Sequence, residues 1–119
     1  GIPKTIDNDV DVIDRSFGFH TAVEAAQEAI MSAKVEASCT LPRGVCVVKL
    51  MGRYSGFIAS HATLGSGDVD LCLIPEVPID LDACMLHLKQ RVQDQGHAVV
   101  VVAEGAGETL LGELAEYDL

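Results

Sequence analysis

Three short apolar runs are spaced along the chain. They cover residues 45–50, 71–74 and 98–103, and they are rich in β-branched side chains and almost free of charge. That composition is typical of strands buried in a parallel sheet. The runs therefore predict three strands.

Amphipathic stretches lie between and around these runs. Apolar side chains recur every three or four residues from Ser16 to about residue 35, which predicts a helix with Ser16 as its N-cap. A short helix is expected from 55 to about 64. A clearly amphipathic one is expected from 80 to about 95, with Gly96 as its C-cap. After the third strand, we expect residues 104–107 to form a loop before a final helix.

Strands that alternate with helices predict an α/β fold. We expect a parallel sheet with helices on both faces, a Rossmann-like three-layer sandwich, as one unit over residues 1–119. A hydrophobic content of 49% is enough for a packed core. Because the chain starts with Gly1 and shows no signal pattern, we interpret it as a segment of a longer protein. The sheet is therefore expected to be incomplete in this segment.

Charge and composition exclude several classes of function. The formal net charge of −10 argues against a nucleic-acid-binding surface, which requires clustered Lys and Arg. No apolar run approaches the roughly 18 residues that span a membrane. The four cysteines show no CxxC spacing and are interpreted as reduced thiols. These features favour the cytoplasm, with a plastid as the alternative.

Candidate chemistry collects where the predicted strands end. In open parallel sheets, ligands bind beyond the carboxyl ends of the strands. The segments there are 51–53 (MGR), 75–76 (PE) and 104–107 (EGAG), and the opening loop 5–9 adds two carboxylates. A guanidinium beside a glycine suits an oxyanion, and a loop carboxylate can take a proton from a hydroxyl. Together they suggest group transfer to an anionic substrate that carries a hydroxyl.

Each segment has a simpler explanation when it is taken alone. The TIDND loop at 5–9 could cap a helix, because Asp is favoured near a helix N-terminus. Arg53 could be a surface ion-pair partner, and Glu104 a carboxylate at the rim of the sheet. Only their combination favours an active site.

That combination resembles the phosphofructokinase family. Residues 3–9 (PKTIDND) are similar to the family's catalytic loop, and 51–53 (MGR) follow in the family's order and roughly its spacing. Glu104 stands where the family has a substrate-binding glutamate. Residues 17–22 (FGFHTA) and 73–76 (LIPE) resemble its connecting segments. The resemblance covers nearly the whole chain.

The resemblance implies a role for each matching residue. Asp7 would be the general base that takes the proton of the 1-hydroxyl of fructose 6-phosphate, Thr5 would contact the substrate or the transferred phosphoryl group, and Arg53 would stabilise charge during transfer. The implied substrate-binding residues are Thr5, Ile6, Asp7, Met51, Gly52, Arg53 and Glu104. Asp9 would lie near the Mg²⁺ ion that the reaction requires.

The resemblance leaves the phosphoryl donor open. Lys4 occupies the position that distinguishes donor classes, and residues 51–59 (MGRYSGFIA) look most like the plant-type ATP-dependent group. We therefore favour ATP, with a pyrophosphate-dependent enzyme as one alternative and a truncated, non-catalytic sugar-phosphate-binding chain as another. The family's glycine-rich nucleotide loop is absent from residues 1–119. The segment alone is thus expected to be inactive, and the full enzyme is expected to be a homo-oligomer.

Overall fold

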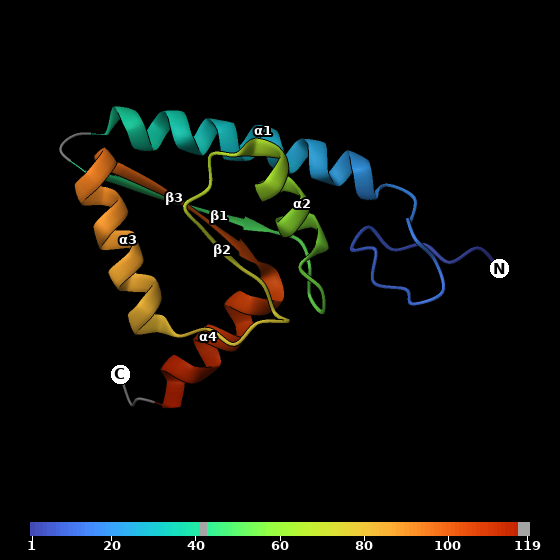
Figure 1. Ribbon diagram of the computed structural model, residues 1–119. Helices are drawn as coiled ribbons and strands as arrows, with labels where there is room; N and C mark the ends of the chain where they lie inside the picture. Colours follow the sequence, from blue (N-terminus) through green and yellow to red (C-terminus); the bar gives the residue numbers. More distant parts are fainter. Residues whose placement is uncertain (41–42, 117–119) are drawn as a thin grey trace.

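A computed structural model describes residues 1–40 and 43–116. Four helices and three strands alternate along the chain (Figure 1). They are α1 (Phe19–Cys39), β1 (Gly44–Leu50), α2 (Phe57–Ser66), β2 (Leu71–Leu73), α3 (Leu81–Gln95), β3 (His97–Ala103) and α4 (Glu104–Glu116). The α/β class and the three strands predicted from the apolar runs are confirmed.

The strands form one parallel sheet in the order β1-β3-β2. Gly44 pairs with His97 at the start of β1, and Leu71 pairs with Val100 at the start of β2. The central strand is the last in the sequence and the most apolar. Its residues Ala98–Val101 are all buried. The order of the strands was not predicted from the sequence.

One face of the sheet is closely packed. Helices α1 and α2 lie against it (Figure 1). The small side chains of Ala59 and Ala62 in α2 are buried there and let that helix approach the sheet. A large buried aliphatic or aromatic side chain contributes about 1.5–3 kcal/mol, so this face supplies most of the packing energy. Its buried residues are Phe19, Val23, Ala26, Ile30, Ala37, Ile58, Ala59, Ala62, Val99, Val101 and Ala103.

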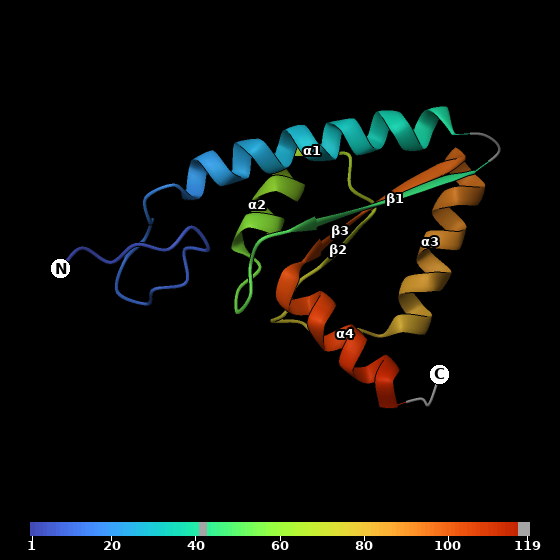
Figure 2. The same cartoon turned by 180° about the vertical axis from the view of Figure 1, so that it is seen from behind.

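The opposite face is only partly covered. Helices α3 and α4 lie on it, so helices flank both faces as predicted (Figure 2). However, no residue of α3 is buried. On β1, Val45 and Val47 are 50% and 65% exposed, although their strand composition suggested burial. The sheet is therefore covered fully on one side and incompletely on the other.

Three expectations about helix starts are wrong, and the simplest is that α2 begins at Phe57 rather than at residue 55. Helix α1 begins at Phe19, and its N-cap position is Gly18 (φ 85°) rather than Ser16. The Ser16 hydroxyl instead donates a hydrogen bond to the Thr5 carbonyl. The expected loop at residues 104–107 is also missing, because α4 begins at Glu104 directly after β3. The first helix also runs to Cys39, beyond the expected end near residue 35.

The predicted boundaries of α3 are confirmed. Asp80 caps it by accepting a hydrogen bond from Ala83 N at 3.1 Å, and Gly96 (φ 83°) ends it as the C-cap. The four cysteines are free thiols; three of them are half-buried and Cys39 is exposed. Within the described ranges, no helix is long and apolar enough to cross a membrane.

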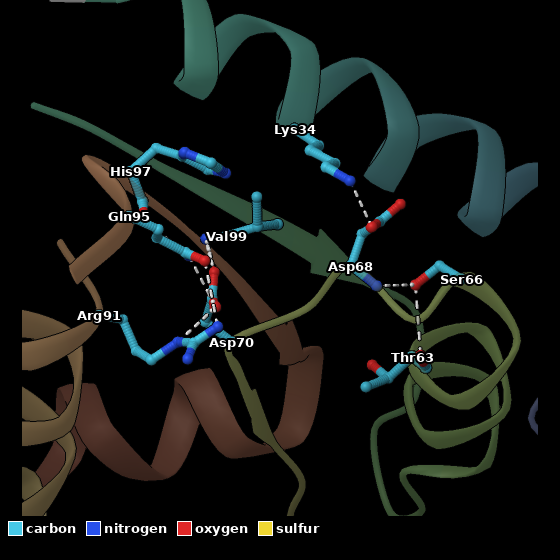
Figure 3. Close-up of polar contacts among 9 residues, drawn as sticks. All are labelled: Lys34, Thr63, Ser66, Asp68, Asp70, Arg91, Gln95, His97 and Val99. Carbon is cyan, nitrogen blue, oxygen red and sulfur yellow. Dashed lines mark hydrogen bonds and ion pairs between the residues drawn. The ribbon is translucent and has the colours of Figure 1, made fainter.

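Asp70 joins β2, α3 and β3 (Figure 3). Its Oδ1 accepts hydrogen bonds from Arg91 Nε and Gln95 Nε2, both at 2.9 Å, and its Oδ2 accepts one from Val99 N at 2.8 Å. The side chain is only 6% exposed. Burial alone would raise the pKa of Asp70. The hydrogen bonds from Val99, Arg91 and Gln95, together with the Arg91 charge, outweigh burial and hold the pKa below its usual value.

We expect Asp70→Asn to lower the free energy of unfolding by about 1.5–3 kcal/mol at pH 7, because it removes hydrogen bonds to a charged group. A lowered folded-state pKa stabilises the fold above the unfolded-state pKa, about 3.9, and this contribution is lost as pH falls through the folded-state value. In urea unfolding at decreasing pH, the difference in unfolding free energy between the parent protein and the variant should therefore shrink once the pH falls below the unfolded-state pKa of Asp.

Asp68→Asn is the matched control. Asp68 lies two residues earlier and pairs with Lys34, but both side chains are substantially exposed (42% for Lys34, 31% for Asp68). A pair of this kind contributes about 0–1 kcal/mol. An equal loss from both variants would contradict the role given to Asp70.

Candidate functional site

The segments predicted to form the site lie at one end of the sheet. Met51, Gly52 and Arg53 follow β1, and Pro75 and Glu76 follow β2. Because all three strands are parallel, their carboxyl ends lie at this end of the sheet. Glu104, the first residue of α4, stands at the end of β3 on the same edge (Figure 1).

The opening loop forms a tight turn with its own hydrogen-bond network. Asn8 has a positive φ of 57°, and its N–H donates to the Thr5 carbonyl at 3.4 Å. Its side chain accepts from Ser16 N at 2.7 Å and donates to the Asp14 carbonyl at 2.9 Å. Asp7 N donates to Thr5 Oγ1 at 3.3 Å. Asn8 therefore organises the turn that presents Asp7.

The residues of this turn differ in exposure. Thr5, Ile6 and Asp7 are half-buried, whereas Lys4 and Asp9 are exposed. Ile6 packs against the core. The Asp7 carboxylate has no hydrogen-bond partner among residues 1–40 and 43–116. A half-buried carboxylate without a partner is suited to accept a proton from a bound hydroxyl.

The segment after β1 depends on close backbone approach. Gly52 is buried and has a φ of 135°, a conformation that L side chains rarely adopt. Its carbonyl accepts a hydrogen bond from Gly105 N at 2.9 Å. The Arg53 side chain is exposed, with its guanidinium carbon 5.5 Å from the centre of the Tyr54 ring. In the described part of the chain, no carboxylate lies within ion-pair distance of Arg53.

Hydrogen bonds tie the site segments together. Ser55 Oγ donates to the Asp7 carbonyl at 3.1 Å, which attaches the opening turn to the segment after β1. Gly56 N donates to Glu76 Oε1 at 2.6 Å, which attaches that segment to the end of β2. The bond from Gly105 to Gly52 attaches it to the start of α4. The backbone of the predicted site is thus one connected unit.

The side chains of the predicted site do not contact each other directly. Across the described ranges, the structure has no hydrogen bond or ion pair between Asp7, Arg53 and Glu104. Met51 is 57% exposed beside them.

An open cavity of ≈ 850 Å³ lies next to these residues. Asp9 lines it, but Thr5, Asp7, Arg53 and Glu104 do not, so the predicted catalytic groups are beside the cavity rather than inside it. No cluster of three or more potential metal-ligating side chains occurs among the described residues. The residues that line the cavity are Asn8, Asp9, Val10, Asp11, Ile13, Asp14, Arg15, Phe19, His20, Tyr54, Ser55, Phe57, His61 and Glu76.

Sequence reasoning missed the groups that hold the site in place. Ser16 was interpreted as a helix cap, Ser55 as the start of a short helix, and Asn8 as part of a loop. Only the positive φ of Asn8 could have been inferred, because Asn tolerates that conformation. Ser16 and Ser55 hold the turn through tertiary hydrogen bonds, which no local pattern indicates.

Comparisons with known proteins agree on one family. The family model described as Phosphofructokinase matches residues 1–117. The chain is 60% identical to ATP-dependent 6-phosphofructokinase 1 of Arabidopsis thaliana, over 95% of this chain and 24% of that protein. It is 56% identical to the chloroplastic ATP-dependent 6-phosphofructokinase 5 of the same plant, over 93% of this chain and 21% of that protein.

A solved structure matches in fold as well. The pyrophosphate-dependent phosphofructokinase of Marinobacter aquaeolei aligns with a TM-score of 0.80 and 31% identity, covering 89% of this chain and 29% of that one. The chain thus spans about a quarter of the length of the relatives that it matches.

The contact between Gly105 and the Arg53 backbone gives a stability prediction. A Cβ atom at Gly105 would overlap the Arg53 carbonyl oxygen and come within 3.3 Å of Pro75 Cβ. We expect Gly105→Ala to destabilise the fold by about 1–3 kcal/mol, the usual cost of overpacking. Thermal and urea unfolding of the purified protein would measure it.

Gly107→Ala is the control in the same helix. A Cβ there meets only Val102 Cγ1 at 3.6 Å, which is an ordinary contact. Because Ala is favoured over Gly in a helix by up to about 1 kcal/mol, this variant should be neutral or slightly stabilising. If Gly105→Ala and Gly107→Ala had the same unfolding free energy, the close approach of Gly105 to Arg53 would not contribute to stability.

Proposed function

The chain belongs to the phosphofructokinase family, and from that premise we propose that it is part of an ATP-dependent 6-phosphofructokinase, which converts fructose 6-phosphate to fructose 1,6-bisphosphate in glycolysis. The observation that carries the proposal is the 60% identity, over 95% of this chain, to a plant protein named as an ATP-dependent 6-phosphofructokinase. We propose that residues 1–119 form a partial domain with the catalytic turn and the sugar-phosphate side of the site.

Asp7 is the proposed general base. Its carboxylate would take the proton of the sugar 1-hydroxyl as that oxygen attacks the terminal phosphorus of the donor and the bond to the leaving phosphate oxygen breaks. The half-buried position of Asp7 and the absence of a hydrogen-bond partner for its carboxylate in the described residues support this role. Thr5, whose hydroxyl lies in the same turn, would contact the substrate or the transferred phosphoryl group.

Arg53 is proposed to neutralise the charge on the transferred phosphoryl group. Phosphoryl transfer depends on positioning and on stabilising oxygen charge, and a guanidinium provides both. The exposed Arg53 side chain, which has no ion-pair partner in the part of the chain that the structure covers, is available for this role. Ile6, Met51, Gly52 and Glu104 would complete the sugar site, with Glu104 accepting a hydrogen bond from a sugar hydroxyl.

Asp9 is the proposed ligand of the Mg²⁺ ion. Mg²⁺ usually binds through one or two carboxylates together with substrate phosphates and water, so the exposed Asp9 carboxylate, which lines an open cavity, fits such an ion. When bound, the ion would neutralise charge on the donor phosphates.

ATP is the proposed donor. The 60% and 56% identity to two plant proteins named as ATP-dependent supports it. Lys4, exposed beside the catalytic turn, is the proposed donor-specificity residue. Pyrophosphate remains the alternative donor, and a non-catalytic sugar-phosphate-binding chain the alternative function. We place the enzyme in the cytoplasm or, like the relative named as chloroplastic, in a plastid, and propose that it is a homo-oligomer.

A donor assay tests the function. We expect a full-length phosphofructokinase carrying this chain to form fructose 1,6-bisphosphate from fructose 6-phosphate with ATP, and at least tenfold more slowly with pyrophosphate. Residues 1–119 alone should give no turnover. Binding of fructose 6-phosphate without turnover by the full-length protein would support the non-catalytic alternative, and a preference for pyrophosphate would reverse the donor assignment.

Asp7→Asn tests the base. The amide has nearly the same shape but cannot take the proton, and losing a general base costs about 10²–10⁴-fold in rate. We expect this loss in kcat, with the KM for fructose 6-phosphate changed by less than about threefold, as a transition-state effect requires. A kcat within twofold of the parent enzyme would remove Asp7 from the mechanism. Asp94→Asn, which changes an exposed carboxylate of α3 outside the cavity, is the control.

A further inference from the structure

We propose that Ser55 is a positioning residue for phosphoryl transfer, an inference that rests on the proposed role of Asp7. Its hydroxyl donates to the Asp7 carbonyl at 3.1 Å. Ser55 lies two residues after Arg53, so one hydrogen bond joins the residue proposed as base to the segment that carries the phosphate-binding arginine. In this role Ser55 acts through the Asp7 backbone rather than on the substrate or the reacting atoms.

The burial of Ser55 supports this role. Ser16 and Ser55 are the buried polar or charged residues in the described part of the chain, at 7% and 5% exposure. A buried hydroxyl is costly unless it is hydrogen-bonded. Both hydroxyls donate to carbonyls of the same turn, Ser16 to Thr5 and Ser55 to Asp7. The turn that presents Asp7 is therefore held at its start and near its end.

Ser55 supplies the long-range attachment of this turn. Within residues 1–40 and 43–116, its bond to Asp7 is the only hydrogen bond between residues 1–16 and any residue beyond α1. The other bonds of the turn stay inside the opening loop. Without Ser55, the polar interactions of the loop would leave its position relative to Arg53 unfixed.

The segment that carries Ser55 is itself anchored on both sides. Before it, the Gly52 carbonyl accepts from Gly105 N at 2.9 Å; after it, Gly56 N donates to Glu76 Oε1 at 2.6 Å. Gly56 leaves no space for a side chain, because a Cβ there would overlap Ile74. The backbone around Ser55 is thus held in place, and the hydrogen bond from Ser55 holds the Asp7 backbone relative to it.

The consequence is a specific kinetic defect. A displacement of about 1 Å at a reacting group can cost 10²-fold in rate, so partial loosening of the turn should cost roughly tenfold. In a full-length phosphofructokinase carrying this chain, we expect Ser55→Ala to lower kcat about tenfold and to leave the KM for ATP within twofold. Ser55→Thr, which keeps a hydroxyl, should recover most of the loss.

Ser66→Ala is the matched control. The Ser66 hydroxyl bonds to the Thr63 carbonyl at 3.2 Å, at the far end of α2 from the site. Ser66→Ala should leave kcat within twofold of the parent enzyme. If Ser55→Ala is not folded at the assay temperature, as judged by the lack of a cooperative thermal melt, Ser55→Cys replaces it in the test. Cysteine has a similar volume to serine but is only a weak hydrogen-bond donor. Equal kcat for the Ser55 variants and Ser66→Ala would overturn the proposal.

A double-mutant cycle separates positioning from general stability. If Ser55 acts through Asp7, adding Ser55→Ala to Asp7→Asn should change kcat by less than twofold, because the group being positioned no longer works. A full tenfold further loss would show that Ser55 acts elsewhere and would overturn the inference. If Asp7→Asn alone leaves kcat unchanged, the proposed base fails. If it lowers kcat while Ser55→Ala does not, only the role of Ser55 fails.

Discussion

The parallel pairing of β1 and β2 with β3 is the constraint on which the rest of the structure depends. Because all three strands run in the same direction, Met51–Arg53, Glu76 and Glu104 all emerge at one edge of the sheet. The central strand can hold this register because Val99 and Val101 face α1 and α2, while Ala98 and Val100 are buried on the other face. Residues far apart in the sequence are thereby brought to the same end of the sheet.

The site combines two kinds of support. Strand ends are placed by the sheet and carry close backbone contacts, such as the bond between Gly105 and Gly52. The turn containing Asp7 belongs to no regular element and relies on the buried hydroxyls of Ser16 and Ser55. Because a net charge of −10 would repel a phosphorylated substrate, the proposed function requires individual placed cations. Arg91 is engaged by Asp70 in a structural contact, whereas Arg53 is exposed.

The sequence predicted the elements better than their arrangement. Apolar runs identify strands because a parallel sheet buries them, and Asp80 and Gly96 mark the ends of α3 because capping is local. The order β1-β3-β2 depends on how distant segments pack, which no local pattern encodes. Ser16 was misassigned for the same reason. Its hydroxyl has a good local use as a helix cap, but the tertiary bond to Thr5 takes precedence, and Gly18 begins the helix instead.

The candidate site follows the same division. Asp7 could be proposed from the motif of its loop, and Arg53 and Glu104 from their places after predicted strands. The hydrogen bonds that hold the backbone around them became apparent only in the fold. A charged side chain that performs chemistry must reach a ligand, so it stands at a strand end or in a turn, where sequence rules apply. A hydroxyl that fixes such a group must be buried against a carbonyl elsewhere in the chain, as Ser55 is against Asp7. Positioning groups are therefore the part of a site for which sequence patterns are least informative, and tertiary structure is needed to find them.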